Sequence, residues 1–335
     1  GLDRWLRDHQ YTIPPGAEPL LRPYVEQGTK WFVAKVDPKK VKFENGMATL
    51  SPLRFYYDSP EFALPIRLGL ANSAGTQDLI VNILSPDSRF EVANYPNVTI
   101  PTNITVKNEV RDHFGEFYAA LFDHALAESP GAVVTEYAWD SGSCDPCPGP
   151  TLDGNDLLTF GGDVLQSTYK GENMYSMTLT RLHARYGKDI GNDLVFRAVE
   201  PIVGGRGIPD AQGKIDSSVQ KTSNNNFQGR YVILHPWDGP VACANPQRGQ
   251  WGGPNGRDQK IATPATNLAF APRGAQLSSF VAGALPTVTP LSSGGSKLPI
   301  PVRQPQGCGC EAEGGAQGLA GFALLGLWLR RRRPR

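Results

Sequence analysis

The alternation of hydrophobic and polar residues along the chain predicts more strands than helices. Two short helices are expected at residues 2–10 and 17–27, because Pro14 and Pro15 separate them and Gly28 ends the second. Beyond them, runs rich in aromatic and β-branched residues predict strands, since such side chains fit a pleated, half-buried surface. The predicted strands cover residues 30–36, 47–57, 64–70, 78–84, 132–139, 177–186, 193–199 and 228–235.

Residues 64–70 and 78–84 are predicted to pair as a β-hairpin. In the first segment, apolar residues alternate with other residues, which is typical of a half-buried strand. Residues 73–75 (Ser-Ala-Gly) supply a turn signal, and the second segment (78–84, DLIVNIL) returns as the partner strand.

One long amphipathic helix is predicted from about residue 107 to residue 128, ended by Pro130 and Gly131. His113 and His124 fall off its apolar stripe and are expected to face solvent. The stripe repeats at intervals of three and four residues. It consists of Val110, Phe114, Phe117, Leu121 and Ala125.

Composition fits a globular body with many turns. The 335 residues include 40% apolar residues, enough for a packed core, together with 37 glycines and 29 prolines. Helices mixed with short-connected strands favour an α+β fold with a mixed, antiparallel-rich sheet, plus an apolar C-terminal helix. We expect a main domain at 1–285, a linker rich in Pro, Ser and Gly at 286–306, and a tail at 307–335.

Charge separates the tail from the body. The net charge is +1, but five arginines and two glutamates lie in residues 308–335. Without that segment the chain carries 28 basic and 30 acidic residues. The body therefore offers no basic stripe of the kind that binds nucleic acid, and no nucleic-acid partner is expected.

The tail has the pattern of a short membrane helix. Residues 314–329 form an uncharged stretch of 16 residues, close to the roughly 17–25 needed to span a bilayer. Arginines beside a span stay on the cytoplasmic side. The prediction is an exported protein, held in the membrane by this helix with its C-terminus inside and its body outside. The first residues show no apolar leader, so a signal segment is expected upstream of Gly1. The basic cluster is Arg330, Arg331, Arg332 and Arg333.

Two cysteines precede this span. Cys308 and Cys310, the short apolar stretch and the arginine run together resemble the myxobacterial-type C-terminal sorting signal. The resemblance implies recognition by an intramembrane sorting protease, cleavage at the cysteine motif and delivery to the cell surface. Which cysteine is processed, and whether it is lipidated, stays open.

Cys144 and Cys147 form the most conspicuous local motif of the body. A C-x-x-C pair can be a disulfide element, a redox dithiol or half of a zinc site. The proline-rich sequence that follows offers no helix N-terminus to activate a thiol, which argues against redox chemistry. Oxidation is the default in an exported protein, so a structural disulfide involving Cys144, Cys147 or Cys243 is favoured. A zinc set completed by Cys243 and His235 is the weaker alternative.

Other polar motifs are weaker. Glu136 and Asp140 lie four apart on a predicted strand, about 13 Å at ~3.3 Å per residue, which exceeds the carboxylate spacing of glycosidases. Residues 153–156 and 189–193 faintly resemble calcium loops, and residues 204–207 a phosphate loop, but all three fit turns better.

Several segments carry a resemblance to a known family. They are residues 31–41, 50–84, 95–103, 133–147, 179–187 and 193–205, and together they resemble the family called domain of unknown function 2330 over roughly residues 1–255. The resemblance implies export and a shared fold, but no activity, cofactor or catalytic residue.

The sequence thus favours a surface-anchored protein with a non-enzymatic binding or structural role and an open surface ligand. The competing hypothesis is a surface or periplasmic hydrolase, or a thiol- or metal-dependent enzyme. Its candidate residues are Cys144, Cys147, Cys243, His183 and His235.

Overall fold

The structure is a computed structural model. It describes residues 2–33, 37–72, 75–142, 152–164, 177–187, 192–205, 215–235 and 271–291, apart from residues 14, 45, 46, 50–52, 56 and 58, and adds five residues between 239 and 245. Contacts divide the chain into two compact units, residues 1–301 and 302–335, and all described residues belong to the first.

Both predicted N-terminal helices are confirmed, as α1 (Leu2–Asp8) and α2 (Ala17–Glu26). The strand predicted at 30–36 is wrong in its described part, because residues 30–33 belong to no strand. The Trp31 ring packs edge-on against Tyr24 of α2 instead, with centroids 6.0 Å apart. Next come the 3₁₀ turn η1 (Pro38–Lys40) and the hairpin of β1 (Lys42–Glu44) with β2 (Met47–Thr49). The strand predicted at 47–57 is therefore confirmed only at its start.

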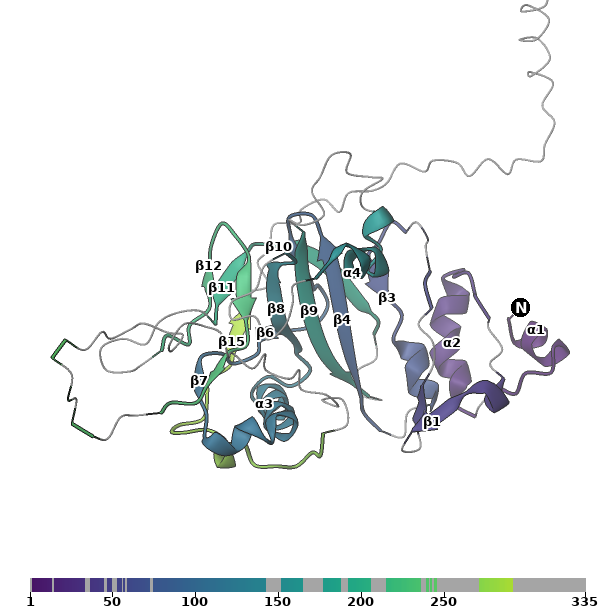
Figure 1. Ribbon diagram of the computed structural model, residues 1–335. Helices are drawn as coiled ribbons and strands as arrows, with labels where there is room; N and C mark the ends of the chain where they lie inside the picture. Colours follow the sequence, from purple (N-terminus) through teal and green to yellow (C-terminus); the bar gives the residue numbers. More distant parts are fainter. Residues whose placement is uncertain are drawn as a thin grey trace, which may run out of the picture. The chain divides into compact units, whose positions relative to one another are not determined.

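Strand β8 (Val133–Asp140) forms the centre of an eight-stranded sheet (Figure 1). Along one edge it pairs with β9 (Thr178–Tyr186), which in turn pairs with β4 (Gln77–Ser85). Along its other edge, the first half of β8 pairs in parallel with β6 (Asn97–Thr99), and the second half pairs with β13 (Asn226–Gln228).

The large sheet extends beyond both β6 and β13. Strand β15 (Thr289–Leu291) pairs with β6, while β11 (Ile202–Gly204) and β12 (Gln220–Lys221) extend from β13. The linker predicted at 286–306 therefore begins inside the fold.

Two smaller sheets hold the other described strands. One has the order β3 (Ala63–Leu64), β10 (Leu194–Val199), β5 (Arg89–Val92). The other is a parallel pair, β7 (Ile104–Thr105) with β14 (Tyr231–Val232). The strand predicted at 228–235 is thus two short strands that join different sheets.

The predicted hairpin of 64–70 with 78–84 is wrong. The second segment is a strand, β4, but its partner is β9, and of the first segment only Leu64 belongs to a strand, β3. Most of the first segment lies in the 3₁₀ helix η2 (Arg67–Asn72). The Asp193 carboxylate fixes the chain there, because it accepts hydrogen bonds from the backbone N–H groups of Ile66 and Arg67 at 2.9 and 3.1 Å.

The long helix predicted at 107–128 is present but shorter. A 3₁₀ turn, η3 (Asn108–Arg111), precedes α3 (Phe114–Glu128), and His113 between them has non-helical dihedral angles (φ −122°, ψ 34°). The predicted stripe is confirmed, since Phe117, Leu121 and Ala125 have no exposed surface. The remaining short helices are α4 (Gly154–Thr159) and η6 (Leu277–Ser279).

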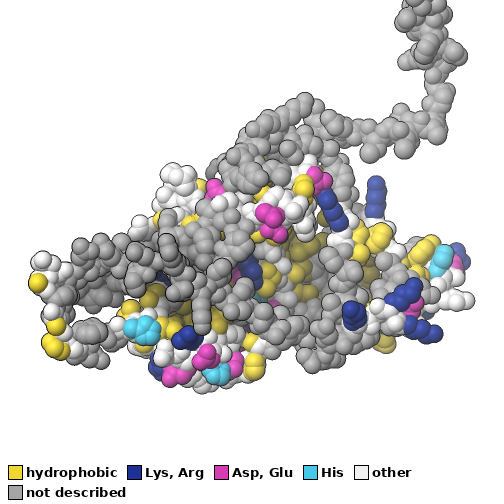
Figure 2. Space-filling view, viewed as in Figure 1, with side chains coloured by type: hydrophobic (Ala, Val, Ile, Leu, Met, Phe, Trp, Pro, Cys, Tyr) yellow, Lys and Arg dark blue, Asp and Glu magenta, His cyan; other side chains and the backbone are white. Residues whose placement is uncertain are grey.

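Two apolar clusters form the core. One lies between α3 and the large sheet and includes Phe117, Leu121 and Val134. The second joins the large sheet, through Leu182, to the three-stranded sheet, through Phe196. The α+β class and the mixed, antiparallel-rich sheet are confirmed, whereas the predicted C-terminal helix lies outside the described residues. Figure 2 shows apolar, acidic and basic side chains interspersed on the visible described surface.

Candidate functional site

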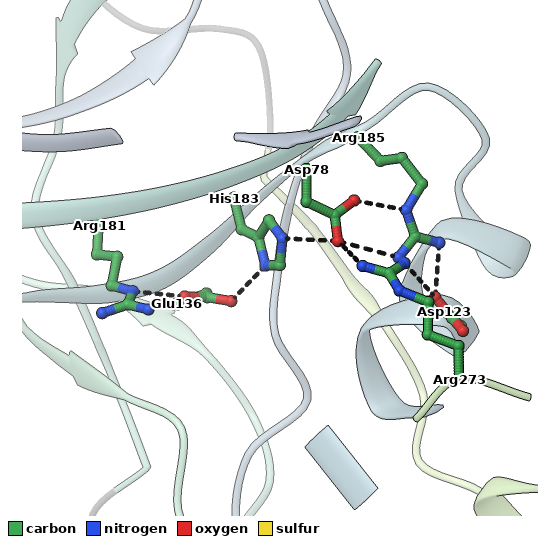
Figure 3. A network of polar contacts seen from close by, with 7 residues as sticks. All are labelled: Asp78, Asp123, Glu136, Arg181, His183, Arg185 and Arg273. Carbon is green, nitrogen blue, oxygen red and sulfur yellow. Dashed lines mark hydrogen bonds and ion pairs between the residues drawn. The ribbon is translucent and has the colours of Figure 1, made fainter. Parts of the chain in front are cut away.

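A network of seven charged or titratable side chains lies between the large sheet and α3 (Figure 3). Strand β9 supplies three of these side chains, because Arg181, His183 and Arg185 occupy alternate positions along it. Side chains at alternate positions share one face of a strand. This face of the strand packs against α3, because the His183 ring stacks on Phe122 of that helix.

Glu136 binds two of these side chains from β8. The pairing register of β8 with β9 shifts between Thr135 and Tyr137, so Glu136 sits at a β-bulge. A bulge can redirect a side chain within a sheet. Glu136 Oε1 lies 2.8 Å from His183 Nδ1, and Arg181 Nε donates to Oε2 at 2.7 Å. The Glu136 side chain is only 4% exposed, so its charge depends on these partners.

His183 lies between two carboxylates. Its Nδ1 contacts Glu136, and its Nε2 lies 3.6 Å from Asp78 Oδ2, close enough for an ion pair but too long for a hydrogen bond. The imidazole stacks on Phe122, with ring centroids 3.5 Å apart and planes 5° from parallel. Burial disfavours the imidazolium, but Asp78 and Glu136 outweigh it, so the pKa of His183 is raised above its ordinary value.

Arg185 extends the network from the sheet to α3. Its guanidinium donates to both oxygens of Asp78, at 2.7 and 3.3 Å, and to Asp123 of α3 at 2.6 Å. It also lies 5.1 Å from the centre of the Phe122 ring, a cation–π distance. Arg273, from the segment before η6, binds Asp78 as well and lies 3.8 Å from Asp123.

The two inner carboxylates are held in their ionised form. Burial would raise the pKa of Glu136, but His183, Arg181 and the Tyr118 hydroxyl lower it below its usual value. Burial likewise opposes ionisation of Asp78, and His183 with Arg185 lowers its pKa. The result is an ionic clamp that ties β4, β8, β9, α3 and the 271–276 segment together.

The clamp places an imidazole with a raised pKa between two carboxylates. A histidine–carboxylate pair is one form of general acid–base machinery. Here, however, the imidazole lies between the two carboxylates and contacts both, and Phe122 covers the ring. Two cavities in the described part, one beside Arg89 and one beside Trp5, are lined by other residues.

Most residues singled out from the sequence lie outside the described part of the chain. These are Cys144, Cys147, Cys243, Cys308, Cys310, Arg330, Arg331, Arg332 and Arg333. His235 is described and exposed, after the end of β14. The disulfide, zinc and sorting predictions therefore remain predictions.

The weaker motifs have structural roles where they are described. Asp153 caps α4 by accepting from the backbone N–H groups of residues 155 and 156. Asp140 accepts from the backbone of Gly142, apart from the partners of Glu136. Of the predicted loop at 189–193, only residues 192 and 193 are described, and Asp193 accepts from the Tyr24 hydroxyl at 2.6 Å. His113 is exposed as predicted, whereas His124 is partly buried, with Nε2 2.8 Å from the Pro286 carbonyl oxygen.

The sequence does not predict the clamp as a whole. It points to Glu136 and His183 only as separate candidates, and gives no sign of their partners Asp78, Asp123, Arg181, Arg185 and Arg273. One signal was available, the R-x-H-x-R pattern at 181–185, which sets three basic residues on one face of a strand. Partners on strands far apart in sequence leave no such local pattern.

The described residues contain neither a metal-binding cluster nor a membrane-spanning helix. No group of three or more His, Cys, Asp or Glu side chains among them is arranged to hold a metal ion. Within the same part of the chain, every helix is too short or too polar to cross a membrane.

Comparison with known proteins gives one match. No curated protein and no solved structure matches the chain significantly. A bacterial family described as "Uncharacterized protein conserved in bacteria (DUF2330)" matches residues 1–197, a shorter range than the roughly 1–255 of the sequence resemblance. That range includes β4, β8, β9 and α3, and with them every clamp residue except Arg273. The chain belongs to the DUF2330 family.

Proposed function

We propose that this is an exported protein, held at the cell envelope through residues 307–335, whose folded part is a non-enzymatic binding or structural module. The uncharged stretch at 314–329, followed directly by Arg330–Arg333, supports the envelope placement. The non-enzymatic role rests on one observation: the buried groups best suited to acid–base chemistry, Glu136 and His183, are bound to each other and to neighbouring charged side chains.

Removing the tail tests the envelope placement. In a bacterium that makes the protein naturally, protease added to intact cells should digest the full protein, and deleting residues 308–335 should release the body from the surface. Replacing Cys308 and Cys310 with serine should block processing without changing the fold. Replacing Arg303 with alanine, a single basic residue outside the tail, is the matched control and should change nothing. Unchanged surface retention of the deleted form would overturn the placement.

A hydrolase or a thiol- or metal-dependent enzyme is the second candidate. One observation favours it, the 2.8 Å contact between His183 Nδ1 and the Glu136 carboxylate, which resembles an acid–base pair. Hydrolysis of ester, peptide or glycoside substrates by the purified full chain would have to disappear in His183→Gln or Cys144→Ser. Activity that these variants abolish, while their folding is retained, would replace the non-enzymatic proposal.

A further inference from the structure

A small cavity separate from the ionic clamp lies where β5, β10, β11, β12 and β15 meet. Its volume is about 130 Å³, well below the roughly 300–1,000 Å³ of pockets for drug-sized ligands. Any ligand that it encloses is therefore small. The cavity is formed by segments distant in sequence, from Arg89 to Leu291.

Arg89 brings a buried positive charge to this cavity. The residue is 4% exposed. Its Nη1 donates to Glu91 Oε1 at 2.7 Å, and its Nε donates to the Glu200 carbonyl oxygen at 2.6 Å. Its Nη2 makes no hydrogen bond to the described residues, although arginine side chains at buried sites normally use their donors. The Nη2 group of the guanidinium, with its two N–H donors, thus remains for a ligand.

The surrounding charges leave a positive excess. Glu91 is fully buried and is shared between Arg89 and Arg197, whose Nη2 lies 3.7 Å from Glu91 Oε2. At the rim, Lys221 Nζ pairs with Glu200 Oε2 at 2.6 Å, with both side chains at least half exposed. The charged residues that line the cavity are Arg89, Glu200 and Lys221. Because Arg197 shares the charge of Glu91 with Arg89, one positive charge is in excess, which favours an anion over a cation or a neutral ligand.

Much of the remaining wall is apolar. Val199 and Ile202 are 4% and 2% exposed, and Val219, Pro290 and Leu291 complete this side. An inorganic oxyanion would use the guanidinium but gain nothing from the apolar wall. An alcohol of the same length would use the wall but not the charge.

We propose that this cavity binds a short aliphatic carboxylate, with the carboxylate at Arg89 Nη2 and the hydrocarbon chain against Val199 and Ile202. The inference goes beyond the proposed envelope role and does not depend on where the protein resides. Its chemistry is a charge-assisted hydrogen bond combined with burial of a few methylene groups.

Titration of the full chain with sodium butyrate tests the proposal. Calorimetry or chemical-shift changes should show saturable binding with a Kd on the order of 1 mM, the range for a ligand of so few heavy atoms. n-Butanol, n-butylamine and inorganic phosphate should each bind at least about tenfold more weakly, because each lacks either the carboxylate or the chain. Equal binding of butanol or phosphate, or no saturable butyrate binding, would overturn the proposal.

Two variants locate the binding. Val219→Phe enlarges a lining side chain next to β12, so it fills the cavity and should abolish butyrate binding. The matched control is Leu285→Phe, an enlargement of an exposed side chain outside the cavity lining, and it should bind as the wild type does. Arg89→Lys keeps the charge beside Glu91 but removes the guanidinium fork, and it should weaken binding at least about tenfold. If Arg89→Lys does not fold, Val219→Phe still decides, because unchanged affinity in that variant refutes this location.

Discussion

Replacing Glu136 with glutamine should destabilise the protein, because this carboxylate holds two basic side chains at the bulge of β8. The wild-type carboxylate contacts His183 Nδ1 at 2.8 Å and Arg181 Nε at 2.7 Å. Hydrogen bonds to charged groups contribute about 1.5–3 kcal/mol each. Glutamine keeps one acceptor oxygen and turns an NH₂ group toward the second partner, so one contact is lost and the other weakened.

Two responses limit the cost. The Arg181 side chain is 39% exposed and can be solvated, and His183 can release its proton once the neighbouring charge is gone. We therefore expect a loss of roughly 2–3 kcal/mol in the free energy of unfolding. That is less than the roughly 3–5 kcal/mol for breaking a fully buried ion pair.

Urea unfolding followed by tryptophan fluorescence measures this loss, with an unchanged m value as the sign that the unfolded state is not altered. Glu128→Gln is the matched control, since Glu128 is exposed near the end of α3, and it should stay within about 0.5 kcal/mol of wild type. A double-mutant cycle of Glu136→Gln with His183→Gln should give a coupling of about 1 kcal/mol or more. Additive effects, or a Glu136→Gln loss no larger than the control's, would refute the clamp as a source of stability.

Three further predictions concern pH, a glycine and the attachment of α2. Because the pKa of His183 is raised in the folded state, the stability that its charge contributes is complete below the ordinary pKa of 6.5 and is lost as pH rises through the higher folded pKa. Urea unfolding from pH 5 to 9 should show this fall in the free energy of unfolding of the wild type. A flat response in His183→Gln would confirm that His183 is the source. Gly205→Ala should lower stability by roughly 3 kcal/mol or more, because its Cβ would lie 1.9 Å from the Gln228 carbonyl oxygen. Gly131→Ala, at a similar φ of +72° with nothing within 4 Å, should lower the free energy of unfolding by only about 1–2 kcal/mol. Urea unfolding of both variants measures the difference, and equal losses would contradict the steric argument. Asp193→Ala removes the acceptor of Tyr24 and of two backbone N–H groups, so limited proteolysis should cut near residues 10–30 faster than in wild type, and an unchanged rate would show that α2 is held by other contacts.

Elements with a strong local signal were predicted well. The stripe of α3 and the strands β4, β8, β9 and β10 were recognised because their side chains are buried on at least one face. The segment at 64–70 has the same alternation as these strands, but most of it lies in η2. Its conformation is set by the Asp193 carboxylate, which is more than 120 residues away. Local periodicity contains no information about such a contact.

The candidate site, like the fold, was predicted from the sequence only in part. His183 and Glu136 were visible as isolated polar residues on strands, but their pairing required the alignment of β8 with β9. The bulge at Glu136 also breaks strict alternation, so the facing rule for strands misjudges that residue. The cysteine and arginine motifs are the reverse case, with a clear sequence pattern and positions outside the described part of the chain.

Strand β15 has a mechanical consequence. It is three residues long, pairs with β6 alone in the large sheet, and is the last described strand of the chain. Tension applied to the chain beyond residue 291 therefore reaches the sheet first through the three pairs from Thr289↔Thr99 to Leu291↔Asn97. If the tail tethers the body, β15 would be the first strand to detach under flow or traction. Because β15 also lines the carboxylate cavity, pulling it away would open that cavity while β8, β9 and the ionic clamp stay folded.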